Sequence, residues 1–335
     1  MTAATSVAIA PGATDPLSSS LVRAIADTVR ELGLDAPPVA SRHEERLPDA
    51  LISVGLPLLY HDSRDGSAAT RQIAWFGEPL PRRPDGVGRP APFGRPVMAA
   101  ALRRLGRPGR LVRGVPLPAR LDGLRAAAYV ERERQVNLAA ALRRARAVDL
   151  VVVTSRDRAA VLAGFGIAAR VVPFGYHPTL AGPIVTDTDG RDIPAVAFGS
   201  GLTWSSRRAR GLQACAKHLG PDRLVLAGAT WGKERDGLLR RSRILLDVHR
   251  IPGNFIGLRI LFAAAAGAVL VTEPLDDPHP FVPGRHFVEA PLDALAQAVD
   301  ELLADEHRRQ QIVEASQTFI TGPLSMAASV RAVLA

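Results

Sequence analysis

A histidine and several basic residues surround one strand, loop and helix in the second half of the chain. An apolar strand that passes through Ile244 ends at His249 and Arg250, the segment 254–259 follows, and a run of small residues at 263–267 comes next. In an open parallel sheet such a loop lies at the carboxyl ends of the strands, where ligands bind, and a helix that opens there offers unpaired backbone N–H groups to an anion. The pattern therefore indicates an anion-binding site.

The segment 254–270 resembles a pattern of retaining GT-B glycosyltransferases, E-G-F-G-L-x-x-L-E-A-x-A-x-G-x-P-V. Six residues are in register with it: Gly257, Leu258, Leu261, Ala263, Ala265 and Gly267. Asn254 and Phe262 replace the two glutamates. Phe262 would then lie against the donor ribose and leave a hydroxyl unpaired, so that thymidine diphosphate binds at least as tightly as uridine diphosphate. Alternatively, Phe262 points into the core between helix and sheet.

A closer resemblance is to the glycosyltransferases related to spore-maturation proteins. Five short motifs occur in the order of that family: Trp75-Phe76-Gly77-Glu78-Pro79, Phe198-Gly199-Ser200, Val225 to Trp231, His249-Arg250 and Phe281-Val282-Pro283-Gly284. The resemblance implies an α/β fold of the GT-B type, with two facing Rossmann-like domains, parallel sheets and a cleft between them. It implies an acceptor domain at 1–172, a nucleotide-sugar donor domain at 173–320, and a terminal helix, 321–335, that returns toward the first domain.

The resemblance also implies an activity, the transfer of a hexose from a nucleoside diphosphate sugar to the hydroxyl of a small or lipid-linked acceptor. No D-x-D stands beside the donor loop, and Asp187-Thr188-Asp189 lies in a polar loop, so we expect no metal and no other cofactor. Two alternatives stay open: a non-catalytic GT-B module that serves as a partner subunit, and a sugar-nucleotide epimerase of the same fold. Saturable stabilisation by nucleoside diphosphates would favour an enzyme over the module.

The donor domain must neutralise the leaving diphosphate. The expected donor-binding residues are Gly199, Ser200, Arg208, Trp231, Lys233, Arg250, Asn254, Arg259 and Glu289. Arg207 is an alternative to Arg208, Trp231 either stacks on the base or belongs to the core, and any one arginine could be a solvated surface charge. We expect Arg208 and Lys233 to be exposed, so that alanine at either position weakens diphosphate binding and leaves the fold intact.

Three residues are expected to take part in catalysis. Glu78 ends an apolar strand and matches the acidic position of the family, so it could act as the acceptor base or hydrogen-bond the acceptor. His61 and Asp62 are weaker candidates for the same role. His249 at the switch point of the second domain either faces the ligand or is a structural histidine.

Composition limits the class of protein. A chain of 335 residues predicts two domains. No apolar run reaches the roughly 18 residues that span a bilayer. The amino terminus has no cationic segment before its short apolar stretch, so we expect a cytoplasmic protein.

Cys215, the single cysteine, is expected to be a small buried side chain in a helix rather than a nucleophile.

Positive charge is concentrated in one region. Between Arg82 and Arg146 there are 16 arginines against four acids, an excess larger than the net charge of +9 of the whole chain. Such a region could contact phosphorylated acceptors or the surface of an anionic membrane. The few aromatic residues and the lack of a zinc-type Cys/His spacing argue against nucleic acid. The alternative is an arginine bias of the coding sequence without any ligand.

Alternating strands and helices must position these residues. Strands are expected at 7–10, 51–55, 72–76, 149–154, 195–200, 223–227 and 244–249, and helices at 21–32, 97–105, 126–147, 156–163, 206–219, 235–241, 293–303, 306–320 and 324–334. Segment 171–178 is expected to cross between the domains, and the Pro-, Gly- and Arg-rich segment 79–114 to overhang the acceptor side.

Overall fold

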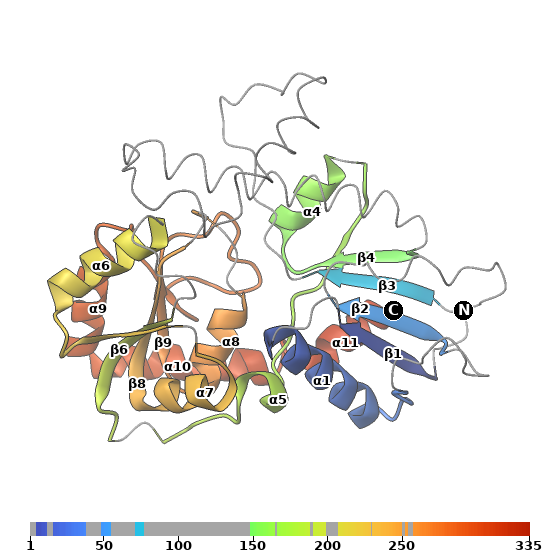
Figure 1. The fold of residues 1–335 in the computed structure, drawn as a ribbon, viewed down its shortest axis with the longest axis horizontal. Coiled ribbons are helices and arrows are strands. Elements are labelled where there is room, and N and C mark those ends of the chain that lie inside the picture. Colours follow the sequence, from blue (N-terminus) through green and yellow to red (C-terminus); the bar gives the residue numbers. More distant parts are fainter. Residues whose placement is uncertain are drawn as a thin grey trace, which may run out of the picture.

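The computed structural model describes residues 5–11, 16–37, 48–54, 71–76, 148–164, 166–187, 190–198, 207–228, 230–249, 252–253 and 257–335. They form two parallel sheets of five strands each, with helices packed against them (Figure 1). The strand order is β1-β2-β3-β4-β5 in the first sheet and β10-β9-β8-β6-β7 in the second. Two parallel sheets, each in its own half of the chain, are the architecture that the sequence predicted.

The first sheet comes from the amino-terminal half. Its strands are β1 (Val7–Pro11), β2 (Ala50–Val54), β3 (Arg71–Phe76), β4 (Leu150–Val153) and β5 (Arg170–Val171), and its helices are α1 (Pro16–Glu31) and α4 (Arg156–Ala163). β2 is buried along its whole length. Such continuous apolar strands are typical of parallel sheets that are covered on both faces.

The second sheet comes from the carboxyl-terminal half. Its strands are β6 (Ile193–Phe198), β7 (Leu224–Ala227), β8 (Ser242–Asp247), β9 (Val269–Thr272) and β10 (Val288–Glu289). Its helices are α6 (Arg207–Leu219), α7 (Gly232–Arg241), α8 (Gly257–Ala265), α9 (Leu295–Ala304) and α10 (Glu306–Thr321). α6 and α9 contact each other, and α8 contacts α7 and α10, so these two groups cover opposite faces of the sheet.

The predicted bounds lie within about three residues of the observed ones for most described elements, but α1 begins at Pro16 instead of Leu21. Helix α4 occupies the expected residues, because Ser155 caps it and accepts a hydrogen bond from the backbone of Arg158. β8 ends at Asp247 instead of His249, since its last ladder partner is Thr272. The helices expected at 97–105 and 126–147 lie outside the described residues.

The chain passes twice between the sheets, and the two crossings lie side by side. The backbone of Tyr176 donates to Leu324 and accepts from Met326, at 2.8 Å in both cases. A Cβ atom on Gly175 would lie 2.3 Å from the carbonyl oxygen of Ser325, so only glycine permits this approach. The short helix α5 (Pro178–Ala181) follows the first crossing, and α11 (Met326–Leu334) follows the second.

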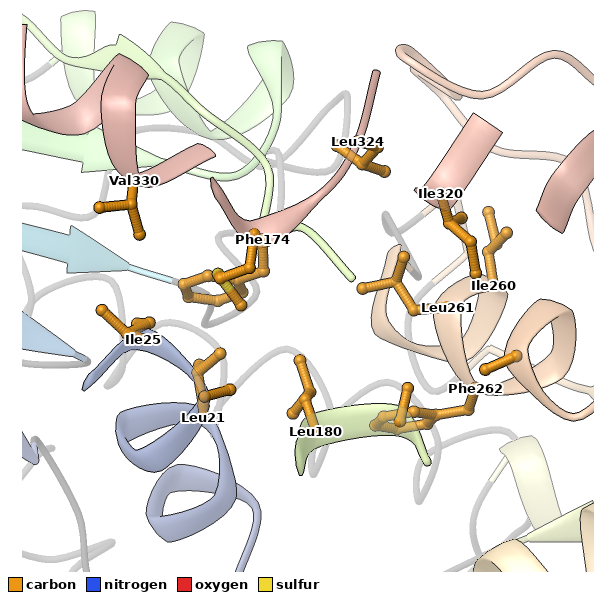
Figure 2. Close-up of a cluster of buried hydrophobic side chains, with 14 of the residues drawn as sticks. Leu21, Ile25, Phe174, Leu180, Ile260, Leu261, Phe262, Ile320, Leu324 and Val330 are labelled. Atoms are coloured by element: carbon orange, nitrogen blue, oxygen red, sulfur yellow. The ribbon is translucent and has the colours of Figure 1, made fainter. Parts of the chain in front are cut away.

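One hydrophobic cluster joins the two halves of the molecule. Figure 2 shows it with Leu21 and Ile25 of α1, Val330 of α11, Leu180 of α5, and Ile260, Leu261 and Phe262 of α8. Helix α11 packs on α1, and the guanidinium of Arg170 in the first sheet donates to the carbonyl of Ala332 at 2.8 Å. The end of the chain therefore lies against the amino-terminal half (Figure 1).

An ion pair joins the carboxyl edges of the two sheets. Arg156, the first residue of α4 after β4, donates through Nε and Nη2 to both carboxylate oxygens of Asp277 at 3.0 and 2.7 Å. Asp277 lies in the loop after β9. The ends of β4 and β9 are thereby held near each other. In the part of the chain that the structure describes, no helix has the length and apolar character that a membrane span requires.

Candidate donor site at the carboxyl ends of the second sheet

Three polar side chains stand in one row across the second sheet. Asp247 of β8 is in register with Thr272 of β9, and Thr272 with Glu289 of β10. Residues in register across parallel strands project from the same face. The residues two positions before Asp247 and Thr272, Leu245 and Leu270, belong to the cluster that includes α8. The row therefore lies on the α8 side of the sheet, at the carboxyl ends of the strands.

Asp247 is a buried carboxylate that pairs with two arginines. Its Oδ1 lies 3.0 Å from Nη2 of Arg208 and 3.2 Å from Nη1 of Arg259. Arg208 also donates to the carbonyl of Phe198 at the end of β6. The Arg208 side chain is 10% exposed and that of Arg259 is 27% exposed. Arg259, in the first turn of α8, is thus the one that keeps a solvent-facing part.

His249 is held just beyond the end of β8. Its ring is buried, and its Nε2 lies 2.8 Å from the hydroxyl of Thr272. The other ring nitrogen, Nδ1, has no hydrogen-bond partner among the described residues. An unpaired polar atom in a buried site is unfavourable unless a ligand or a water satisfies it. Nδ1 is therefore a buried ring atom whose hydrogen-bonding capacity is unused among the described residues.

Glu273 lies on the α6 side of the same strand ends. It is buried, and its Oε2 accepts from Nη1 of Arg207 at 2.9 Å while Oε1 accepts from Nη2. Oε2 also accepts the backbone N–H of His249 at 2.7 Å. Burial raises the pKa of Glu273, but the bonds from Arg207 and His249 outweigh it and hold that pKa below its usual value. Glu273 is therefore ionised at neutral pH.

The charges around His249 act on its ring in both directions. Burial lowers its pKa most strongly, and the nearby cations Arg207 and Arg259 lower it further, whereas Asp247 and Glu273 raise it. The net effect is a pKa below the ordinary value of a histidine. The ring is therefore neutral at neutral pH in the ligand-free protein.

The structure brings together only part of the expected donor set. Arg208, Arg259 and His249 meet around Asp247. Glu289 is the last residue of the row that Asp247 and Thr272 begin, and its Oε1 accepts from the backbone N–H of Leu275 at 3.0 Å. Trp231 and Lys233 lie at the start of α7, after the edge strand β7, and both are exposed. Gly199, Ser200, Arg250, Asn254, Glu78 and His61 lie outside the described residues.

Two expectations about individual side chains need correction. Arg208 is not exposed: it is buried in the pair with Asp247, because the first turn of α6 packs over the end of β8. Phe262 packs in the hydrophobic cluster, and the guanidinium of Arg235 lies 3.8 Å from its ring centroid. The core alternative for Phe262 is confirmed, and the thymidine preference loses its structural basis.

Cys215 is buried in α6, as expected. Burial, with a smaller contribution from the Glu273 charge, raises the pKa of its thiol to about 11. We predict that iodoacetamide alkylates the folded protein at this thiol at least about tenfold more slowly than the urea-unfolded chain, because the thiolate is the reactive form. Mass spectrometry of timed samples measures both rates, and equal rates would contradict the placement of Cys215.

No group of three or more His, Cys, Asp or Glu side chains within the described ranges is arranged to hold a metal ion. Asp187 of the D-x-D spacing is described and the other two residues of that motif are not. The polar atoms that meet at the end of β8 are mostly arginine and histidine nitrogens, a set that suits an anion.

Comparison with known proteins identifies the fold. Residues 207–335 match the model of a family described as glycosyl transferase-like, and no curated protein matches the chain. A glycosyltransferase from Rickettsia africae ESF-5 shares 10% identity and a TM-score of 0.57, over 100% of this chain and 97% of the other. Alr3699/HepE of Anabaena, solved with UDP and glucose, shares 10% identity and a TM-score of 0.59, over 98% of each chain.

A sucrose-phosphate synthase from Thermosynechococcus elongatus is also similar, with 11% identity and a TM-score of 0.56, over 98% of this chain and 97% of that one. These likenesses extend over both sheets. The fold of this protein is therefore the GT-B fold, and its carboxyl-terminal part resembles a glycosyl transferase.

Proposed function

We propose that this protein is a GT-B glycosyltransferase that transfers a hexose from a nucleoside diphosphate sugar to an acceptor hydroxyl. The observation that carries the proposal is the cluster at the end of β8, where the guanidinium of Arg259 stays partly exposed and Nδ1 of His249 has no partner among the described residues. This cluster lies in the part of the chain that matches the glycosyl transferase-like family model. The GT-B neighbour from Anabaena, which was solved with UDP and glucose, supports a nucleotide-sugar ligand.

The reaction breaks the bond between C1 of the sugar and an oxygen of the diphosphate, so negative charge grows on the departing diphosphate. Arg259 and His249 are placed to stabilise that charge, which is a large part of catalysis in such reactions. The acceptor oxygen forms the new bond to C1, and its proton passes to Glu78, the general base that the sequence predicts. His61 is the alternative base.

Further parts of the proposal concern the surroundings of this site. Residues 1–172 bind the acceptor, residues 173–320 bind the donor, and 321–335 return to the first domain. Among the donor contacts, Trp231 stacks on the base and Lys233, Arg250, Asn254 and the backbone at Gly199 and Ser200 complete the diphosphate site, with Arg208 and Glu289 beside it. The acceptor is a small or lipid-linked molecule.

We place the enzyme among the glycosyltransferases related to spore-maturation proteins, in the cytoplasm and without a metal. In this proposal the Arg-rich region 82–146 contacts an anionic membrane surface peripherally. A metal is unnecessary if arginine and histidine neutralise the diphosphate, and that requirement can be tested together with donor binding.

Calorimetric titration with UDP tests the donor site. We expect Arg259→Ala to weaken UDP binding by about tenfold or more, because a charge-assisted hydrogen bond to the diphosphate is lost. Arg240→Ala is the matched control: this exposed arginine lies in the last turn of α7, near the amino ends of the strands, and its loss should change affinity by less than about twofold. EDTA should leave the affinity of the parent unchanged.

Three results would count against the proposal. Absence of saturable binding by UDP, GDP and thymidine diphosphate would favour a non-catalytic module. Equal losses in Arg259→Ala and Arg240→Ala would move the diphosphate away from α8. Binding that disappears in EDTA and returns with a divalent cation would show that the site needs a metal.

A further inference from the structure

The backbone of His249 is held by side chains instead of a strand partner. The ladder of β8 ends at Asp247, two residues earlier. Beyond it, the N–H of His249 donates to Oε2 of Glu273 at 2.7 Å, and its carbonyl accepts from Nη1 of Arg207 at 2.9 Å. Arg207 and Glu273 are themselves joined by two parallel hydrogen bonds. The N–H and the carbonyl of His249 belong to the two peptide groups that flank its Cα. Glu273 bonds the first, Arg207 bonds the second, and the bonds between Arg207 and Glu273 close a ring.

This arrangement satisfies both backbone polar groups of His249 with side chains. A buried ion pair is weak support for stability, because desolvation of both charges offsets much of their attraction. What the pair adds is geometry, since the planar guanidinium and the carboxylate meet in a fixed fork. The hydroxyl of Thr272 fixes the rotation of the His249 ring through Nε2. Backbone and ring are both held, and Nδ1 alone is left without a partner among the described residues.

We propose that Arg207 and Glu273 are positioning residues that hold His249 so that its Nδ1 faces the diphosphate of the donor. The part of this inference that concerns the diphosphate rests on the proposed function, whereas the part that concerns the position of the ring does not. It also gives Arg207 a role that differs from the one expected for it. The guanidinium of Arg207 donates its hydrogen bonds to the carboxylate of Glu273 and the carbonyl of His249. Arg207 therefore acts through His249 and not as a direct ligand of the phosphates.

The first test needs no ligand. The full chain is labelled with ¹³C at the ring Cε1 of its eight histidines, and the His249 signal is assigned by its loss in His249→Gln. The key variant is Arg207→Lys, which keeps the positive charge but cannot form the fork. We expect the His249 signal to shift and broaden in Arg207→Lys and in Glu273→Gln, because the ring samples more than one position. The seven other signals should stay in place.

Asp192→Asn is the matched control. Asp192 pairs with Arg241 through the same kind of double hydrogen bond, but at the amino ends of β6 and β8. Its loss should leave the His249 signal unchanged. If Glu273→Gln fails to fold, Arg207→Lys decides the question alone. An unmoved His249 signal in the folded variants would overturn the positioning role.

The second test asks whether Arg207 acts through His249. UDP affinity is measured by calorimetry in the parent, Arg207→Lys, His249→Gln and the double variant. We expect Arg207→Lys to weaken binding about tenfold in the parent and by less than about twofold in the His249→Gln background, because the aligned bond is already absent there. Equal losses in both backgrounds would overturn the inference and make Arg207 a direct ligand. If the parent does not bind UDP, the proposed function fails, and the ring signals still decide the positioning role.

Discussion

Alanine in place of Arg208 should lower the free energy of unfolding by about 3 to 5 kcal/mol. This is the usual effect of removing one partner of a buried ion pair, because the other charge stays buried without full compensation. Arg208 pairs with Asp247, which is 2% exposed, and it also satisfies the carbonyl of Phe198. Arg259 remains beside Asp247, which places the expected value near the lower end of the range. Urea unfolding followed by circular dichroism measures the loss.

Lys233→Ala is the control for this measurement, since Lys233 is an exposed cation in the same half of the chain. Its replacement should change the free energy of unfolding by less than about 0.5 kcal/mol. If both variants lose the same small amount, the buried pair between Arg208 and Asp247 does not exist as described, and the packing of α6 over β8 would have to be revised.

UDP binding should draw a proton into the site, and His249 should be the group that takes it up. Before UDP binds, burial of the ring and the charges of Arg207 and Arg259 lower the pKa of His249. The ring is therefore neutral in the ligand-free protein. A bound diphosphate brings negative charge close to the ring and raises that pKa. The complex then holds more protons than the free protein, so affinity rises as the pH falls from 8 toward 6.

Calorimetry in two buffers with different ionisation enthalpies at one pH measures this proton uptake. His249→Gln should abolish the uptake and the pH dependence that comes from it, and should weaken binding at pH 6.5 by about tenfold or more, because a charge-assisted hydrogen bond is lost. His218→Gln is the control, since His218 is exposed, lies in the last turn of α6 and pairs with Asp300 of α9. Uptake that persists in His249→Gln would assign the proton to another group.

The fold was predictable because its strands are short apolar runs separated by helices of clear periodicity. The apolar run of β4 and the Ser155 cap of α4 are examples in which sequence pattern and local chemistry agree. The ends of strands were less predictable. Whether β8 stops at Asp247 or continues to His249 depends on the register with Thr272, which is set by the partner strand and not by the residues of β8.

Of the residues at the end of β8, the sequence predicted Arg208, Arg259, His249 and the nearby Glu289, but it did not predict Asp247 or Glu273. Arg259 and His249 follow from their places after a buried strand, but the carboxylates Asp247 and Glu273 had no such signal, because their function depends on which arginines the tertiary fold brings to them. Neighbouring residues of a helix point about 100° apart. Arg207 and Arg208 therefore have different partners, a difference that the sequence Arg207-Arg208 does not specify.

Phe262 shows the same limit. Its alignment with a ribose-binding glutamate suggested contact with the donor, and its apolar character suggested the core. In the fold Phe262 packs in the hydrophobic cluster, and the guanidinium of Arg235 of α7 covers its ring. The contact between α7 and α8 that brings the two side chains together is long-range and cannot be derived from either helix alone.

The central claim is that the diphosphate of the donor binds between His249 and Arg259. A crystal structure of the protein with UDP tests that position most directly. The account predicts diphosphate oxygens within about 3 Å of Nδ1 of His249 and of the guanidinium of Arg259, a normal hydrogen-bond distance, while Arg207 keeps its two bonds to Glu273. A diphosphate bound elsewhere, with His249 and Arg259 unliganded at full occupancy of UDP, would contradict it.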